Sequence, residues 1–270
     1  MKIIDFHTHV FPDKIAHGTI SALSSTASIE PHSDGTISGL LKRMEEGQVD
    51  ISVNLPVLTR ATQFNSILNF AKEINSSSFG DKGIISFAGI HPEIEDYEKA
   101  LNTVKAEGFL GIKIHPDYQG TFFDDEKYVN ILSYAKKLDL ITVTHAGLDG
   151  AFIGQEIKCT PKRVLNLLSR IGGYDKLVLA HMGGNELSKD VLDNLAGESV
   201  YFDTSYVLPY IGQDMFEKIL AKHGENKILF ATDSPWQSTK NMVDILKGYK
   251  LGDSVERKIL YENGKKLLNI

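Results

Sequence analysis

Eight short runs of β-branched and other apolar residues recur along the chain, and segments with helical periodicity separate them. The predicted strands are Lys2–Phe6, Val49–Leu55, Ile84–Ile90, Phe109–Ile114, Leu140–Thr144, Lys176–Ala180, Ser199–Asp203 and Lys227–Thr232. Strands that alternate with amphipathic helices are typical of a parallel sheet made of βα units. Eight such units in 270 residues favour closure into an α/β (β/α)8 (TIM) barrel over an open, doubly wound sheet.

The helix signals support the same organisation. Thr160 and Pro161 form a helix start before Lys162–Arg170, and Ser254–Leu268 predicts one extra C-terminal helix after the eighth unit. No linker, charge block or solenoid repeat interrupts the chain, so we expect residues 1–270 to form a single domain. The segment Gly18–Asp34 is rich in Ser and Thr. It is predicted to be a loop, either on the surface or as a lid over the barrel mouth.

Charge and composition exclude several functions. The net charge is −6, and no basic run exceeds two residues, which argues against a nucleic-acid partner or an anionic membrane surface. No apolar stretch approaches ~18 residues, so no membrane span is expected. The single cysteine, Cys159, excludes an intrachain disulfide and a Cys-rich zinc module. The first residues lack the apolar segment of a signal peptide, so we expect a cytoplasmic protein.

The positions of the nine histidines indicate where the site lies. Six of them stand at or just past the carboxyl ends of predicted strands: His7, His9, His91, His115, His145 and His181. Asp233 stands just past the end of the eighth predicted strand. The carboxyl ends of the strands of a (β/α)8 barrel converge on one face, where catalytic residues gather. We therefore predict a site at this face.

Spacing within the strands supports a metal site. His7 and His9 are two residues apart and project to one side of their strand, which makes a pair of imidazoles suited to zinc, iron or manganese. Asp5 shares that side, either to orient a ligand or as a buried polar group of the strand. Lys113 lies within the apolar fourth strand, where an ammonium is costly to bury unless it is paired or altered.

Six motifs extend these observations over almost the whole chain: Asp5–His9, Gly111–Pro116, Thr144–Gly147, Ala180–Gly184, Thr232–Trp236 and Glu262–Leu268. With them the chain resembles the metal-dependent amidohydrolase superfamily. It is most similar to the branch that includes aminocarboxymuconate-semialdehyde decarboxylase and related hydrolases. The combination of a His-X-His pair with later histidines and a final Asp, in this order, carries the resemblance.

The resemblance implies a set of ligands. In members that bind one ion, the residues matching His7, His9, His145 and Asp233 hold the metal, and the residue matching His181 faces the activated water or the substrate. The implied cofactor is a divalent metal. Zinc is the expected ion, although imidazole and carboxylate ligands also suit iron, manganese or nickel.

Lys113 leaves the number of ions open. In members that bind two ions, a carboxylated lysine at this position bridges them, and the residues matching His145 and His181 hold the second ion. Alternatively, Lys113 is a free amine that pairs with Asp233 or Asp117, or that contacts a substrate carboxylate. Relatives that are deoxyribonucleases carry a glutamate at this position instead, which makes a nuclease a poor match.

These residues predict a metal-dependent hydrolase of a small amide, ester or lactone. Asp233 would accept a proton from a metal-activated water and return it to the leaving group, while His181 would polarise the scissile carbonyl. The alternative is a lyase that decarboxylates a small unsaturated or aromatic acid on the same metal, with Arg60 or Lys113 binding the carboxylate. A non-catalytic metal-binding barrel is less consistent with this complete ligand set.

Residues after the strands are expected to shape a pocket for a small molecule. The candidate substrate contacts are Arg60, Tyr118, Gln119 and Trp236. His91 is either another contact or part of a turn that ends its strand, and the other histidines, His17, His32 and His223, are expected at the surface. The resemblance also allows a homo-oligomer, which is common for this architecture.

Overall fold

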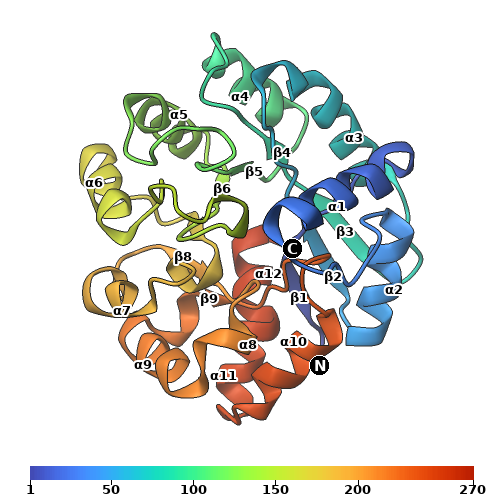
Figure 1. The fold of residues 1–270 in the computed structure, drawn as a ribbon, viewed down its shortest axis with the longest axis vertical. Coiled ribbons are helices and arrows are strands. Elements are labelled where there is room, and N and C mark those ends of the chain that lie inside the picture. The colour runs from blue at the N-terminus through green and yellow to red at the C-terminus, as the bar shows by residue number, and fades with distance from the viewer.

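The computed structural model describes residues 1–270 and shows parallel strands surrounded by a ring of helices (Figure 1). The strands are β1 (Ile4–Thr8), β2 (Ile51–Asn54), β3 (Gly83–Ser86), β4 (Ala88–Gly89), β5 (Gly111–Ile114), β6 (Ile141–Thr144), β7 (Leu177–Leu179), β8 (Tyr201–Asp203) and β9 (Ile228–Leu229). They pair in sequence order as β1-β2-β3 and β4 to β9, always parallel. All eight predicted strands are present, and the third is divided into β3 and β4.

Backbone hydrogen bonds close the barrel between β1 and the segment that follows β9. Phe6 N–H donates to the carbonyl of Phe230 over 2.9 Å, and Asp233 N–H donates to the carbonyl of His7 over 2.8 Å. At the division between β3 and β4, Phe87 N–H donates to the carbonyl of Asn54 over 2.9 Å. The predicted (β/α)8 barrel is therefore confirmed, and β1 meets the last strand at the level of His7 and Asp233.

The helices that follow the strands cover the outside of the barrel. They are α1 (Asp13–Ala27), α2 (Ile37–Gly47), α3 (Phe64–Ser76), α4 (Tyr97–Ala106), α5 (Glu126–Lys137), α6 (Pro161–Ile171), α7 (Ser188–Asp190), α8 (Leu208–Ile211), α9 (Gln213–His223) and α10 (Thr239–Gly248). Thr160 caps α6 by accepting a hydrogen bond from Arg163 N–H, as its sequence predicts. None of the helices combines the length and apolar character needed to cross a membrane.

The C-terminal helical segment plugs one end of the barrel. It runs without a break from α11 (Asp253–Arg257) through a π-helical turn (Lys258–Glu262) to α12 (Asn263–Leu268), so the single helix predicted over Ser254–Leu268 is present. Leu267 and Leu268 join the barrel interior, a buried cluster that also contains Ile4 and Phe6 from β1. Since β1 begins at Ile4, this plug closes the amino ends of the strands and leaves the carboxyl ends as the mouth.

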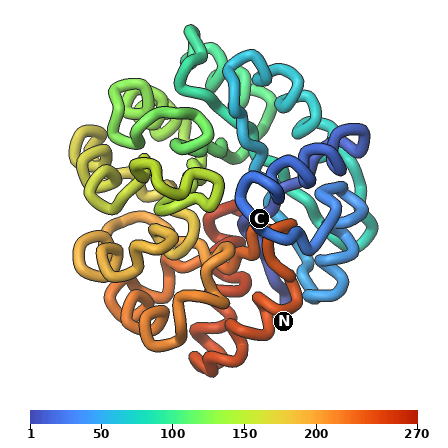
Figure 2. Tube along the Cα trace, viewed as in Figure 1, coloured from blue at the N-terminus to red at the C-terminus, as the bar shows by residue number.

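The prediction of a loop over Gly18–Asp34 is wrong for most of its length. Helix α1 continues to Ala27 because Ala16 and Ile20, four residues apart, both pack into the protein. The helix packs against the 3-10 turn Gly150–Phe152 after β6, and further along His32 N–H donates to the carbonyl of Pro235 over 2.7 Å. The segment therefore bridges loops at the barrel mouth, where the lid alternative put it, and in Figure 2 the dark blue trace of the N-terminal region passes in front of the middle of the molecule.

Candidate metal centre

Three predicted metal ligands meet at the barrel mouth. The His9 Nε2 atom lies 3.1 Å from Asp233 Oδ1, and His7 Nε2 lies 3.5 Å from the same oxygen. The ligand atoms of the three residues all lie within 4.8 Å of one another. The ends of β1 and of the last strand bring them together, because hydrogen bonds join these two segments of chain.

The Nδ1 hydrogen bonds of the two rings assign their Nε2 atoms to a metal, which would displace the present contacts of His7 Nε2 with Lys113 and of His9 Nε2 with Asp233. His9 Nδ1 donates to the carbonyl of Leu55 over 2.8 Å, and His7 Nδ1 donates to the Asp203 carboxylate over 2.9 Å. A neutral imidazole that donates from Nδ1 carries a lone pair on Nε2. Two such lone pairs and the carboxylate oxygen of Asp233 thus converge, which is a donor set that a divalent cation fits.

His145, the fourth predicted ligand, has the expected chemistry but a different position. His181 Nδ1 donates to the Ser205 carbonyl, so His181 Nε2 accepts from His145 Nδ1 over 3.0 Å. The Nε2 atom of His145 is therefore unprotonated, and it is buried without a hydrogen-bond partner. It lies 4.0 Å from Asp117 Oδ2, another buried atom without a partner, and outside the group formed by His7, His9 and Asp233.

Five strand-end histidines form a continuous row across the mouth. Ring centroids are 5.0 Å apart for His9 and His7, 5.6 Å for His7 and His181, 4.7 Å for His181 and His145, and 4.3 Å for His145 and His115. The prediction that the strand ends bring histidines together is confirmed for these five. Burial lowers the pKa of His145 well below its ordinary value, so its ring is neutral at physiological pH.

A second group, His115, His145 and Asp149, is hydrogen-bonded in a way that does not suit one ion. His115 Nε2 lies 3.2 Å from Asp149 Oδ2. The rings of His115 and His145 are stacked at an interplanar angle of 15°, so their lone pairs lie in nearly parallel planes. One ion cannot lie in both planes. Asp149 therefore serves as the hydrogen-bond acceptor of His115.

Lys113 contacts the candidate centre directly. Its side chain is 1% exposed, and its Nζ donates to His7 Nε2 over 3.0 Å. Burial lowers the pKa of Lys113 to about 8, while the carboxylates of Asp203 and Asp233 oppose this shift. The ammonium thus remains mostly charged at neutral pH and occupies the lone pair that a metal on His7 would use. As a free amine it pairs with the imidazole of His7, and not with Asp233 or Asp117 as one of the sequence-based alternatives had it.

Asp203 is a site residue that the sequence reasoning missed. It ends β8, is fully buried, and contacts His7 through one oxygen and the His181 backbone through the other. Burial alone would raise the pKa of the Asp203 carboxylate. The interactions with His7 and Ser205 outweigh burial and lower the pKa to about 2. The available signal was its place at the end of the seventh predicted strand, equivalent to that of Asp233 on the eighth.

Asp5 is a buried polar group of strand β1. This is one of the two interpretations that the sequence left open. Its carboxylate accepts hydrogen bonds from Thr232 N–H over 2.9 Å, from Thr232 Oγ1 over 2.6 Å and from His7 N–H over 3.3 Å. Burial raises the pKa of Asp5 to about 7 despite these bonds. The residue ties β1 to the last strand and contacts no imidazole nitrogen.

The prediction that Gln119 contacts a substrate is wrong. Its amide nitrogen donates to the carbonyls of Leu58 and Ile90 over 2.9 and 2.6 Å. Its amide oxygen accepts from His115 N–H over 3.1 Å and from the Tyr128 hydroxyl over 2.5 Å. Both donors and both lone pairs are used, so this buried side chain fixes loops to one another and has no polar group left for a substrate.

The other three predicted substrate contacts have different degrees of exposure. Arg60 is exposed at the start of a short 3-10 turn. Tyr118 is partly buried, with its ring 4.7 Å from that of His115 and 5.0 Å from that of Phe152. Trp236 is partly buried, and its backbone N–H donates to the backbone carbonyl of Asp233 over 2.8 Å. Tyr118 and Trp236 thus lie beside site residues, while Arg60 is at the periphery.

The prediction that His223 lies at the surface is wrong. Its ring stacks on Phe202 at 3.8 Å with an interplanar angle of 6°. Its Nε2 donates to the Val200 carbonyl over 3.1 Å, and its Nδ1 accepts from Gly197 N–H over 3.2 Å. Burial lowers its pKa to about 4. This histidine joins helix α9 to the segment before β8.

Two of the remaining histidines lie at the surface, as predicted, and one ends a strand. His17 and His32 are exposed. His91 is buried, and its Nδ1 accepts from Glu93 N–H over 3.1 Å. That bond forms the turn after the third predicted strand. The structure therefore supports the interpretation of His91 as part of a turn, and not as a substrate contact.

Three residues at the candidate centre have a left-handed backbone. The φ angles of His181, Tyr206 and Asp233 are 60°, 63° and 67°. They lie in the left-handed region, which residues other than Gly rarely adopt. Such strain costs on the order of 1–3 kcal/mol per residue and tends to occur at functional sites. Two of these residues are predicted to act in catalysis, and the third follows β8 at the mouth.

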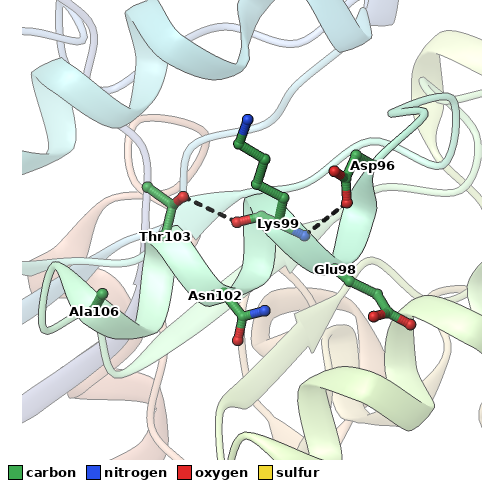
Figure 3. A pocket seen from close by; sticks show the side chains of 6 residues that line it. All are labelled: Asp96, Glu98, Lys99, Asn102, Thr103 and Ala106. Atoms are coloured by element: carbon green, nitrogen blue, oxygen red, sulfur yellow. Dashed lines mark hydrogen bonds between the residues drawn. The ribbon is translucent and has the colours of Figure 1, made fainter.

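A depression on the outer face of α4 is separate from this centre (Figure 3). Its polar groups are used by the helix itself: Asp96 accepts from Lys99 N–H over 3.0 Å, and Thr103 Oγ1 donates to the Lys99 carbonyl over 2.9 Å. It is a feature of the helix surface and offers no unpaired polar group from Asp96 or Thr103 to a ligand.

The barrel and the cluster of imidazoles and carboxylates at its mouth are typical of a metal-dependent barrel enzyme. The sequence matches the family described as amidohydrolase over residues 4–270. The chain therefore belongs to the amidohydrolase family, as its motifs indicate. A search of curated proteins gives no match.

Solved structures confirm the fold over the whole chain. The chain is similar to 2,6-dihydroxybenzoate decarboxylase in complex with 2,6-dihydroxybenzoate, with a TM-score of 0.74 and 16% identity, covering 100% of both chains. It is similar to a putative amidohydrolase from Staphylococcus aureus, with a TM-score of 0.71 and 20% identity, covering 100% of both chains. A probable 2-pyrone-4,6-dicarboxylic acid hydrolase from Acinetobacter baumannii with bound citric acid gives a TM-score of 0.69 and 17% identity, again covering 100% of both chains.

Proposed function

We propose that this enzyme is a metal-dependent hydrolase of a small amide, ester or lactone. The observation that carries the proposal is the convergence of His7 Nε2, His9 Nε2 and Asp233 Oδ1 at the barrel mouth. Both rings use Nδ1 for their other hydrogen bonds, so a metal would take the two Nε2 atoms and displace Lys113 from His7. Zinc is the expected ion. Manganese is the alternative, since a similar structure, a dihydroxybenzoic acid decarboxylase from Polaromonas, holds manganese.

The proposed mechanism assigns proton transfer to Asp233. A divalent ion in this donor set would lower the pKa of a water from ~15.7 toward ~7 and polarise a carbonyl group. Burial raises the pKa of Asp233, but in the metal-free fold a hydrogen bond from His9 Nε2 and the neighbouring His7 outweigh burial and hold the pKa below its ordinary value, so the carboxylate is ionised. A metal on His9 Nε2 would replace the proton of that bond. Asp233 accepts the proton of the attacking water and then returns it to the leaving group. The ring centroid of His181 lies 5.6 Å from that of His7, and its Nε2 is unprotonated, so His181 would have to take up a proton on Nε2 before it could stabilise the charge that develops on the carbonyl oxygen.

A second candidate function is decarboxylation, and one observation favours it. Lys113 places a buried ammonium beside His7, where it would attract the carboxylate of an unsaturated or aromatic acid. The similarity to a decarboxylase of dihydroxybenzoate supports this alternative, and the similarity to a pyrone dicarboxylic acid hydrolase supports the first.

Isotope incorporation distinguishes the two functions. The metal-loaded enzyme is incubated in water enriched in ¹⁸O with a panel of lactones, esters and amides, and in D₂O with a panel of unsaturated and aromatic acids. A hydrolase places ¹⁸O in the product carboxylate and releases no carbon dioxide. Carbon dioxide release with deuterium on the product carbon would instead assign the lyase. If neither panel is turned over by the wild type above the level of an Asp233→Asn variant, both assignments are wrong.

A further inference from the structure

The buried carboxylate of Asp203 contacts two histidines of the site, although Asp203 is not one of the predicted metal ligands. Asp203 Oδ2 lies 2.9 Å from Nδ1 of His7, which is on β1 at the other side of β9. Asp203 Oδ1 accepts from the backbone N–H of His181 and from that of Ser205, each over 3.0 Å. The Ser205 hydroxyl also donates to Oδ1.

Ser205 completes the arrangement around His181. Its carbonyl oxygen lies 3.0 Å from His181 Nδ1, and its hydroxyl lies 3.0 Å from the same nitrogen. Because the carbonyl only accepts, His181 carries its proton on Nδ1. The unprotonated Nε2 then accepts from His145. Asp203 and Ser205 therefore determine which nitrogen of each ring is free.

We propose that Asp203, supported by Ser205, is the positioning residue that selects the tautomer and ring orientation of His7 and His181. This inference rests on the proposed metal-dependent function. All four groups that surround the carboxylate are donors, and an ionised carboxylate is the side chain of this size that only accepts. Asp203 fixes the Nδ1–H tautomer of His7 and so keeps Nε2 unprotonated, able to bind a metal once Lys113 is displaced.

An asparagine of the same shape cannot satisfy these partners. Its amide NH₂ group must replace either Oδ2 or Oδ1 of Asp203. In the first orientation it faces His7 Nδ1, which favours the tautomer with a proton on Nε2 and blocks the metal. In the second orientation it faces the N–H groups of His181 and Ser205, and donors then oppose donors. Either orientation disturbs one of the two histidines.

The test is the affinity of metal-free Asp203→Asn for Co²⁺ and Zn²⁺, measured by competition with a chromophoric chelator. Loss of a carboxylate that orients a ligand histidine typically weakens metal affinity about 10–100-fold, and we expect a loss in that range. The visible spectrum of the Co²⁺ form should change as the ligand field changes. Ser205→Ala keeps the Asp203–His7 contact, so it should bind metal like the wild type and lower kcat.

Asn263→Leu is the matched control for general destabilisation. Asn263 is buried and donates to the carbonyls of Glu225 and Ile228 over 2.7 and 2.8 Å, away from the imidazoles. It should lower the thermal midpoint and leave the Co²⁺ spectrum unchanged. If Asp203→Asn does not fold, ¹⁵N NMR of the metal-free wild type gives the tautomer of His7 directly.

The outcomes separate this inference from the proposed function. If the wild type binds no divalent metal, the proposed function is wrong. If the wild type binds metal and Asp203→Asn binds it equally well with the same Co²⁺ spectrum, the positioning role is wrong and the function stands. A proton on Nε2 of His7 in the metal-free wild type would also overturn the positioning role.

Discussion

Lys113 and a metal ion compete for the same lone pair, and replacing Lys113 by methionine tests this competition. The Nζ atom donates to His7 Nε2 over 3.0 Å, and a metal on that nitrogen must displace it. Methionine fills much of the same buried volume without a donor or a charge. In Lys113→Met the lone pair is free before the metal arrives.

The size of the effect follows from this one contact. A hydrogen bond that involves a charged group contributes about 1.5–3 kcal/mol, and each 1.4 kcal/mol corresponds to about a tenfold change in affinity. Metal binding to the wild type loses the bond, whereas binding to Lys113→Met does not. We therefore expect the first divalent ion to bind about 10–100-fold more tightly to the variant.

The assay is a chelator competition titration of metal-free protein, combined with elemental analysis of the metal-loaded form. Lys99→Met, on the outer face of α4 (Figure 3), is the control and should bind metal like the wild type. Weaker binding by Lys113→Met would refute the competition. A fall from two ions per chain to one would show that Lys113 is a bridging ligand, as in relatives with a carboxylated lysine.

Three further predictions concern individual residues. Asp233→Asn should lower kcat about 10²–10⁴-fold, the usual contribution of a proton-transfer group, with part of the metal retained; near-normal turnover would remove Asp233 from this role. His223 has a pKa of about 4 in the fold against 6.5 for the free side chain, so its contribution to stability is full above pH 6.5 and is lost as the pH falls toward 4. The loss approaches about 3 kcal/mol, and urea unfolding of His223→Gln should show a shallower decline between pH 7 and 4.5; equal slopes would contradict this. Gln119→Ala should lower stability by about 1–3 kcal/mol for each buried partner left unpaired, and an unchanged thermal midpoint would contradict its role between the loops.

Local spacing allowed part of the site to be predicted from sequence. His7 and His9 share one side of a strand because side chains alternate, and closure of the barrel then places Asp233 beside them. The residues that orient these ligands could not be found in this way. The contact between Asp203 and His7 joins positions 196 residues apart, and it depends on how far a side chain reaches across the barrel interior.

The errors in the predicted fold have a similar origin. The segment Gly18–Asp34 is rich in Ser and Thr, which are weak helix formers, and the packing of Ala16 and Ile20 stabilises α1 there. His223 has a sequence context typical of an exposed helix end, but the ring of Phe202 covers it. Both outcomes depend on tertiary contacts that local composition does not encode. The expected cytoplasmic location, the small-molecule substrate and the possible homo-oligomer remain predictions.

Anomalous diffraction from crystals of the metal-loaded enzyme tests the central claim most directly. Data collected on either side of the zinc or manganese absorption edge locate the ion independently of any assumption about its ligands. We predict an anomalous peak within bonding distance of His7 Nε2, His9 Nε2 and an Asp233 carboxylate oxygen. A metal-loaded, active crystal whose peak lies only between His115 and Asp149, or that shows no peak beside His7 and His9, would contradict the account.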